Sequence, residues 1–126
     1  MSERRMYPRF TFTQTVELRG PSGMQFDVES CDISVAGLGM FMMHDIVVAL
    51  AQGGNILMPG DRLQVLLPGT LNPSLEGGLT LECQVKHVRR LSRDQYQVGV
   101  RFLDPTPGQT AGLEALVQSA KRVPFR

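Results

Sequence analysis

Apolar and polar side chains alternate along most of the chain, and this period of two is typical of half-buried β-strands. The first two alternating runs are separated by Gly20-Pro21-Ser22-Gly23, a sequence typical of a turn. They predict a β-hairpin whose inward-facing residues are Phe10, Phe12, Val16, Leu18, Met24, Phe26 and Val28. The period slips near Ser30, which predicts a β-bulge in the second strand, after which Cys31 and Ile33 face inward.

The register of this hairpin decides which polar residues come together. The predicted pairs between its two strands are Leu18 with Met24, Val16 with Phe26, Phe12 with Cys31 and Phe10 with Ile33. In this register Arg9 lies beside Ser34, and Thr11 lies beside Asp32. We therefore expect the residues that precede the first strand to meet the turn that follows the second.

Four further strands are predicted by the same alternation, at residues 38–42, 63–67, 79–87 and 96–102. The third of these is expected to turn the following residues inward: Leu79, Leu81, Cys83, Val85 and His87. Residues 44–52 combine helical spacing of apolar residues with β-branched neighbours, so they predict either a short helix that caps the barrel mouth or an inserted strand. Six short antiparallel strands predict an all-β fold, a closed or nearly closed six-stranded barrel.

A C-terminal helix is predicted at residues 106–122. Thr106 is suited to cap its N-terminus, Pro107 to occupy its first position and Gln109 to complete a capping box. Apolar residues at positions 113, 116, 117 and 120 form one stripe, which is expected to pack on the barrel. The predicted organisation is one domain over residues 1–126, with a flexible arginine arm at 1–9, the barrel at 10–103 and this helix.

Length and charge limit the class of protein. A chain of 126 residues is long enough for one domain. Its formal net charge of +1 argues against binding nucleic acid through a broadly basic face. No apolar run approaches the roughly 20 residues of a membrane-spanning helix, and the charged N-terminus lacks the apolar segment of a signal peptide. We therefore expect a cytoplasmic protein without membrane insertion.

The two cysteines, Cys31 and Cys83, lack the spacing of a metal site or a redox motif and are predicted to be buried free thiols. We expect neither a metal nor a cofactor. A hydrolase using one of these thiols with His44 or His87 is disfavoured, because no nucleophile motif is present and an inward cysteine is hard to reach. An oligonucleotide-binding barrel is disfavoured too, since the chain has no tryptophan and only two tyrosines for base stacking.

Two polar motifs stand where the predicted hairpin brings them together. Arg5-Met6-Tyr7-Pro8-Arg9 precedes the first strand, and Asp32-Ile33-Ser34-Val35-Ala36-Gly37 forms a turn in which Gly37 is expected to supply a positive φ. Together with the strand at 96–102, these RxxxR and D-x-S-x-x-G motifs resemble the PilZ domain, the bacterial receptor module for cyclic di-GMP. The resemblance covers nearly the whole chain and implies a PilZ-like split barrel without catalytic activity.

The resemblance further implies that cyclic di-GMP binds at Arg4, Arg5, Arg9, Asp32, Ser34 and Gly37. Each arginine presents a planar fork that can pair with guanine O6 and N7 or with a phosphate. Asp32 can accept hydrogen bonds from guanine, and Ser34 can donate or accept. In PilZ domains an arginine at the position of Arg4 goes with an intercalated pair of ligands, and an apolar residue goes with one ligand. The alternative for Arg4 is a solvated charge.

We expect, on this basis, an effector that is not an enzyme. Binding of cyclic di-GMP would order the arginine arm against the barrel and create or hide a surface for an unidentified protein target. The alternative is a PilZ-like protein interaction domain that does not bind the nucleotide. Nucleic acid is not expected among the partners.

Overall fold

A computed structural model describes residues 7–69 and 77–121. This part of the chain forms seven strands and two helices. In chain order they are β1 (Phe10–Thr11), β2 (Thr15–Arg19), β3 (Gln25–Ile33), β4 (Gly37–Met43), α1 (His44–Ala49), β5 (Arg62–Leu67), β6 (Leu79–Arg90), β7 (Gln95–Phe102) and α2 (Pro107–Lys121).

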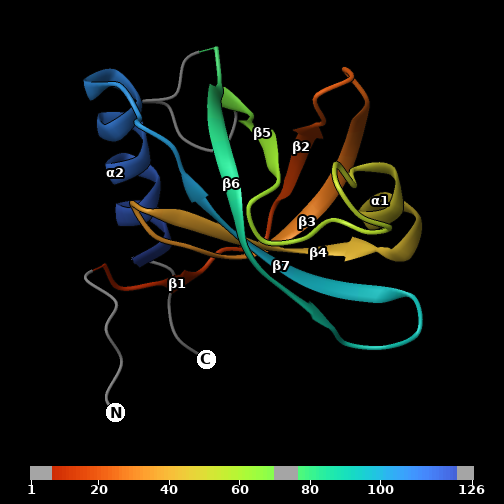
Figure 1. Ribbon diagram of the computed structural model, residues 1–126. Helices are drawn as coiled ribbons and strands as arrows, with labels where there is room; N and C mark the ends of the chain where they lie inside the picture. Colours follow the sequence, from red (N-terminus) through yellow and green to blue (C-terminus); the bar gives the residue numbers. More distant parts are fainter. Residues whose placement is uncertain (1–6, 70–76, 122–126) are drawn as a thin grey trace.

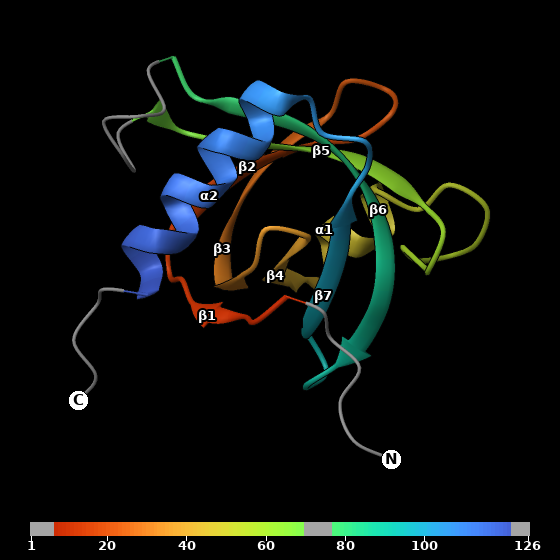
Figure 2. The ribbon, with the colours of Figure 1, turned by 90° about the vertical axis from the view of Figure 1, so that its left-hand side faces the viewer.

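The strands form a closed antiparallel barrel (Figures 1 and 2). Hydrogen-bonded neighbours follow the order β3, β2, β5, β6, β7 and β4, and β4 pairs back with β3. The two-residue strand β1 pairs with the end of β3, beyond β2. The fold is therefore the six-stranded antiparallel barrel with a C-terminal helix that the alternation predicted.

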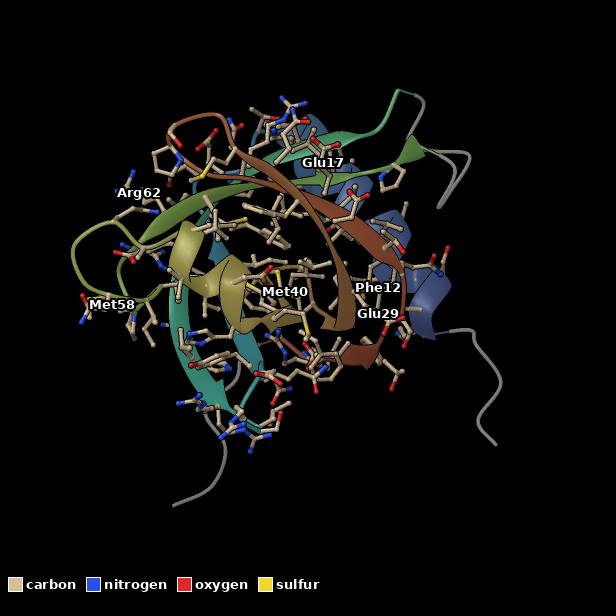
Figure 3. All side chains as sticks on the ribbon, turned by 90° about the vertical axis from the view of Figure 1, so that its right-hand side faces the viewer. Phe12, Glu17, Glu29, Met40, Met58 and Arg62 are labelled. Atoms are coloured by element: carbon tan, nitrogen blue, oxygen red, sulfur yellow. The ribbon has the colours of Figure 1, made fainter. Side chains whose placement is uncertain are left out.

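The inner faces of the strands form one hydrophobic core, which explains why the alternation was informative. Met40 and Met42 of β4 are fully buried (Figure 3 shows Met40 within the barrel), so they fill the core. The ambiguous segment after β4 is a helix, α1, and its Val47 is buried together with Leu50 at one end of the barrel. Figure 1 shows α1 and α2 on opposite sides of the strands.

The predicted capping box of α2 is present. The backbone N–H of Gln109 donates to Thr106 Oγ1 over 3.1 Å, and the backbone N–H of Thr106 donates to Gln109 Oε1 over 2.9 Å. The side-chain amide of Gln109 also donates to the carbonyl of Thr80, which fixes the start of α2 to β6. At the other end of α2, Lys121 Nζ lies 5.9 Å from the ring centroid of Phe10, so the helix spans from β6 to β1.

The register predicted for the first hairpin is right at one end and wrong at the other. Phe10 pairs with Ile33 and Thr11 with Asp32, as predicted, and the backbone N–H of Phe12 donates to the carbonyl of Cys31. Near the turn, however, Leu18 pairs with Phe26 and Val16 with Val28. The prediction failed there because the loop is longer: the backbone N–H of Gly20 donates to the carbonyl of Met24, and Gly23 adopts a φ of 89°.

The irregularity predicted at Ser30 exists, but the first strand carries the extra residue. Thr13 and Gln14 together stand opposite Ser30, because Phe12 bonds to Cys31 while Thr15 pairs with Glu29. The Ser30 hydroxyl lies within hydrogen-bonding distance of the carbonyl oxygens of Phe12 and Gln14, at 2.6 and 3.1 Å, and accepts from the backbone N–H of Gln14. Ser30 therefore stabilises the break between β1 and β2.

Two bulges correct the predicted burial. Between Ser30 and Asp32 the register of β3 shifts against β4, and Cys31 is only partly buried, so the prediction of two buried thiols holds for Cys83 alone. A second shift lies between Val85 and His87, where β6 pairs with β7. It places His87 on the exposed side and leaves Val88 partly buried against the core, so the inward assignment of His87 was wrong.

Neither helix in the described part of the chain is long and apolar enough to cross a membrane.

Candidate functional site

The turn between β3 and β4 is shaped by Ser34. Its hydroxyl oxygen accepts hydrogen bonds from the backbone N–H groups of Ala36 and Gly37, each over 3.1 Å, and its own N–H donates to the carbonyl of Gly37. Ser34 is buried, with 1% of its surface exposed. The structure thus places this motif residue inside the turn, where it holds Gly37 at the start of β4.

Gly37 is required by a close approach of two backbones, and the expectation of a positive φ was wrong. Its φ lies outside the left-handed region, where Gly23, Gly60, Gly77 and Gly78 are found among the described residues. A Cβ atom on Gly37 would stand 2.3 Å from the carbonyl oxygen of Val100. Only glycine lets β4 begin this close to β7.

Arg9 and Asp32 form an ion pair at the edge of this turn. Nε and Nη2 of Arg9 donate to the same carboxylate oxygen, Oδ1 of Asp32, over 3.0 and 2.7 Å. The two side chains are 21% and 33% exposed, so the pair is reachable from solvent. The pairing of β1 with the end of β3 brings the arm and the turn together, as the sequence predicted, although Arg9 was expected beside Ser34 and its side chain pairs with Asp32. Arg4 and Arg5, the other predicted arm residues, lie outside the described residues.

Two glycines form the floor beside this ion pair. Cross-strand pairing sets one row across the outer face of four strands: Asp32 of β3, Gly39 of β4, Gly99 of β7 and His87 of β6. A Cβ on Gly39 would stand 2.6 Å from Asp32 Oδ1, and one on Gly99 would stand 2.2 Å from Cε1 of His87. The missing side chains therefore let the carboxylate and the imidazole lean over the central strands from both sides.

The result is a hollow of about 270 Å³ lined by Arg9, Asp32, Gly39, His87, Arg89 and Gln97. Arg89 Nη2 donates to Gln97 Oε1 over 2.7 Å, and Gln97 Nε2 lies 3.6 Å from Cys31 Sγ. His87, Arg89 and Gln97 were missed as candidate site residues. The signal that could have found them is Val88, an apolar residue out of phase with Val85, which marks the bulge that turns the following positions over.

A larger hollow, of about 430 Å³, lies between the β2–β3 turn and β5. It contains Arg19 and Arg62, but Arg19 donates through Nε to Glu17 over 3.2 Å, and Glu82 adds a carboxylate. Neither predicted motif reaches it. The smaller hollow is therefore the better candidate, because it unites the Arg9 and Asp32 ends of both motifs.

The cysteines are not activated. Burial raises the pKa of the Cys31 thiol; a hydrogen bond from Gln97 opposes this, and the nearby Asp32 carboxylate adds to it. Burial raises the pKa of Cys83 to about 12. Both are neutral thiols at pH 7. His44 bonds to the Tyr96 hydroxyl over 3.1 Å. The described residues contain no cluster of His, Cys, Asp and Glu that could hold a metal ion.

The chain was compared with known proteins. The PilZ domain profile matches residues 3–119. No protein with a curated description matches. Among solved structures, the fold is similar to the PilZ domain with c-di-GMP of YcgR from Escherichia coli, with a TM-score of 0.69, 16% identity and coverage of 95% of this chain and 93% of that one.

Two further similar structures are longer proteins. The inhibitor of motility MotI/DgrA of Bacillus subtilis has a TM-score of 0.63 and 15% identity, with 97% of this chain and 54% of that chain covered. The MrkH–c-di-GMP complex of K. pneumonia has a TM-score of 0.66 and 19% identity, with coverage of 96% and 55%. The chain thus spans about half the length of these two proteins. With the profile match extending over nearly its whole length, the chain belongs to the PilZ domain family.

Proposed function

We propose that the protein is a receptor for cyclic di-GMP and that the nucleotide binds in the hollow beside Arg9 and Asp32. The observation that carries this proposal is the Arg9–Asp32 pair at the rim of a glycine-floored hollow, where the RxxxR and D-x-S-x-x-G motifs meet. Membership of the PilZ family supports it. Two of the similar structures, those of YcgR and MrkH, are described as containing c-di-GMP, which supports it further.

The chemistry of the rim suits guanine. Arg9 offers a planar fork to O6 and N7, or to a phosphate, and its plane can stack on a base. Both described bonds of Asp32 use Oδ1, so Oδ2 can accept from the N1 and N2 donors of guanine. Gly39 and Gly99 have no side chains of their own, but the Asp32 carboxylate and the His87 imidazole lie over them, so a flat base would reach this floor once the exposed His87 ring swings into solvent.

We assign Arg5, and Arg4 before it, to the phosphates and the second guanine, from the order of the motif alone. His87 and Arg89 face Arg9 across the hollow and can donate to a phosphate from that side. Ser34 and Gly37 act indirectly in this proposal, because their hydrogen bonds and close packing fix the turn that carries Asp32. The proposed site then has the arginine arm on one rim and the basic strand β6 on the other.

We further propose that the protein is an effector without catalytic activity, whose arm at residues 1–9 becomes ordered on the ligand and whose changed surface is read by a protein target. Amide hydrogen exchange tests the ordering. Residues 4–9 should exchange more slowly when cyclic di-GMP is added, and equal exchange in both states would contradict the mechanism.

A second candidate function is an interaction domain that does not bind the nucleotide. The Arg9–Asp32 pair also favours this candidate, because each group already satisfies the other without a ligand. Isothermal titration with cyclic di-GMP, with GMP as the control nucleotide, separates the two. Saturable heat for cyclic di-GMP alone supports the receptor, whereas absence of heat for both nucleotides would leave the interaction domain.

A further inference from the structure

The outer face of β4, β7 and β6 continues past the hollow towards the β6–β7 turn. The next row across the strands is Glu29, Phe41, Gln97 and Arg89. The row after that is Met43, Gln95 and Leu91, because Met43 pairs with Gln95 and the backbone N–H of Leu91 donates to the carbonyl of Gln95. The hollow and the end of the hairpin therefore belong to one continuous surface.

The last row exposes two large apolar side chains, Met43 and Leu91, on either side of Gln95. Met43 is 49% exposed and Leu91 is 41% exposed, although both lie at the end of a well-paired sheet. Figure 1 shows the β6–β7 hairpin reaching the edge of the molecule below α1, with no described element over its turn. We call Met43, Leu91, Arg89 and Arg93 the hairpin surface.

The hairpin surface is also the basic end of the molecule. Residues 86–94 contain Lys86, Arg89, Arg90 and Arg93 against one acidic residue, Asp94. The outer side of β2 and the start of β3 instead carries Glu17 and Asp27, and Figure 3 shows Glu17 at the end of the molecule opposite the β6–β7 hairpin; Glu29, further along β3, pairs with Phe41 and so lies in the row of Arg89. The β6–β7 hairpin is thus locally basic although the net charge of the chain is +1, and this local charge would orient the hairpin towards an anionic surface.

The turn is held in a fixed shape. Arg90 donates through Nη2 to the carbonyl of Arg93 over 2.6 Å and through Nε to the carbonyl of Ser92 over 3.1 Å, while its guanidinium lies 5.4 Å from the centroid of the Tyr96 ring. Arg90 is therefore occupied in bracing the turn. The exposed side chains of Leu91 and Arg93 can bind a partner with little further loss of conformational entropy.

We propose that the hairpin surface docks on an anionic phospholipid bilayer. Leu91 and Met43 would enter the interface, and Arg89 and Arg93 would contact lipid phosphates. A projecting turn with two apolar side chains offers little of the about 800 Å² per partner that a stable protein interface buries. It does match a flat surface of apolar chains under anionic headgroups, to which basic residues and a few inserted apolar ones give reversible binding.

Nucleotide binding would weaken this docking, a step that rests on the proposed function. Arg89 lines the hollow and also belongs to the hairpin surface, so the two phosphates of cyclic di-GMP would add negative charge directly beside the lipid-binding cations. Thermodynamic linkage then requires anionic lipid to weaken nucleotide binding by the same factor. The messenger would release the protein from the membrane.

Co-sedimentation with vesicles tests the docking. The full chain should bind vesicles of phosphatidylglycerol and phosphatidylcholine in equal parts, and not vesicles of phosphatidylcholine alone. Arg93→Glu should weaken binding by about fivefold or more, from the loss of one basic residue near the lipid surface. Met43→Ser with Leu91→Ser should weaken it by about tenfold or more. Added salt should also reduce it.

The chain offers matched controls. Met58 is 43% exposed and Arg62 is exposed, and Figure 3 shows both at the side of the barrel, away from the hairpin. Met58→Ser and Arg62→Glu should therefore bind anionic vesicles as the parent does. Equal binding to both kinds of vesicle, or an unaffected Met43→Ser, Leu91→Ser variant, would overturn the proposal. So would binding to a DNA duplex that competes with vesicles and does not depend on Leu91.

The nucleotide step is tested in the same assay. Cyclic di-GMP at a concentration that saturates the calorimetric signal should lower the vesicle-bound fraction, and should do so less at high salt. Calorimetric binding without any release from vesicles would overturn the linkage. Absence of calorimetric binding, with vesicle docking intact, would instead count against the proposed function and leave the docking surface standing.

Discussion

At the scale of single residues, Arg9 and Asp32 combine a structural contact with free binding capacity. Both donors of Arg9 meet one oxygen of Asp32, and the partly exposed pair leaves the other oxygen open among the described contacts. The pairing of Phe10 with Ile33 could be predicted from the sequence and brings Arg9 to the turn, but the predicted neighbour of Arg9 was Ser34 and the register alone does not show that its side chain pairs with Asp32.

We predict that the fork of Arg9, more than its charge, carries nucleotide affinity. Arg9→Lys keeps the charge and loses bidentate pairing, so the binding free energy should weaken by about 1 to 3 kcal/mol in calorimetry. Asp32→Ala should weaken binding as well, while unfolding free energy changes by less than about 1 kcal/mol because the ion pair is partly exposed. A lysine variant that binds like the parent would show that no fork contacts the ligand.

The glycines of the site should fall into two groups. A Cβ at Gly37 would meet the backbone oxygen of Val100, which cannot move aside, so Gly37→Ala should lose unfolding free energy at the upper end of about 1 to 3 kcal/mol. A Cβ at Gly99 would meet the ring of His87, an exposed side chain that can swing into solvent. Gly99→Ala should therefore lose less than about 1 kcal/mol of stability but bind the nucleotide more weakly.

Urea denaturation and calorimetry on both variants check this division. A Gly37→Ala protein as stable as the parent would mean that β4 can move away from β7. The sequence could predict that Gly37 matters but not why, since a positive φ and a close backbone approach both select glycine. The close backbone approach becomes evident only from the position of Val100, which belongs to β7, a strand distant in the sequence.

The pH dependence of stability should reveal the buried thiol of Cys83. Burial raises its pKa in the folded protein from 9.0 to about 12, so the folded state favours the neutral thiol. The free energy of unfolding that depends on this neutral thiol is fully present below pH 9.0. It is lost as the pH rises towards 12, because the thiol of Cys83 ionises at lower pH in the unfolded chain than in the folded one. Between these values the parent should lose stability more steeply than Cys83→Ala, measured as urea midpoints. Parallel slopes would contradict the assignment.

At the scale of elements, the strands could be predicted and their bulges could not. Alternation gives each strand directly, since one face of every strand lies on the core. A slip in the alternation shows that a strand contains an additional residue. It does not show which of the two neighbouring strands lacks a partner for that residue. Ser30 illustrates this: β3 is bulged against β4, whereas against β3 the first strand carries the surplus residue.

Because bulges could not be assigned to a strand pair, half of the candidate site was not predicted. The alternation of β6 up to Val85 extends formally to His87, but the bulge turns His87 outwards and brings Arg89 to the same outer face. The arm side of the hollow was therefore predicted and the β6 side was missed. Both sides depend on pairing with strands distant in sequence, and only the first was fixed by a hairpin.

Ser30 should be a stability determinant of the break between β1 and β2. Its fully buried hydroxyl contacts three backbone groups of Phe12 and Gln14. Ser30→Ala removes this partner from the Phe12 carbonyl and the Gln14 N–H, while the Gln14 carbonyl keeps its bond from the Ser30 N–H, so unfolding free energy should fall by about 1 to 3 kcal/mol. Ser92→Ala, at an exposed turn, is the control and should change little. A Ser30→Ala loss as small as that of the control would mean that the break is held by the backbone alone.

At the scale of the whole molecule, charge is separated although the net value is small. Arg9 and Arg89 stand around the hollow with Asp32, and the carboxylates of Glu17 and Asp27 lie on the outer side of β2 and the start of β3. The net charge of the whole chain predicted no strongly basic face. A net charge describes the chain as a whole and gives no information about the charge at one end of the barrel. The fold converts scattered basic residues into one cationic end, because β6 and the end of β3 are brought to the same outer face through β4 and β7.

That cationic end bears on how many ligands one chain binds. Two intercalated cyclic di-GMP molecules carry four phosphates, and a site with Arg9 and Arg89 around it, together with Arg4 and Arg5 of the arm, can neutralise more than one ligand. We therefore predict two ligands per chain in the parent. Arg4→Leu should bind one, with affinity retained through Arg5 and Arg9.

Calorimetric stoichiometry measures this directly, and Arg62→Leu is the matched control because Arg62 is exposed and lies outside the hollow. The control should keep two ligands per chain, since a general loss of positive charge is not expected to change the number of sites. A parent that binds one ligand would contradict the prediction and make Arg4 a solvated charge. A parent and an Arg4→Leu variant that both bind two would assign the second ligand to the β6 side of the hollow, where His87 and Arg89 could be substituted next.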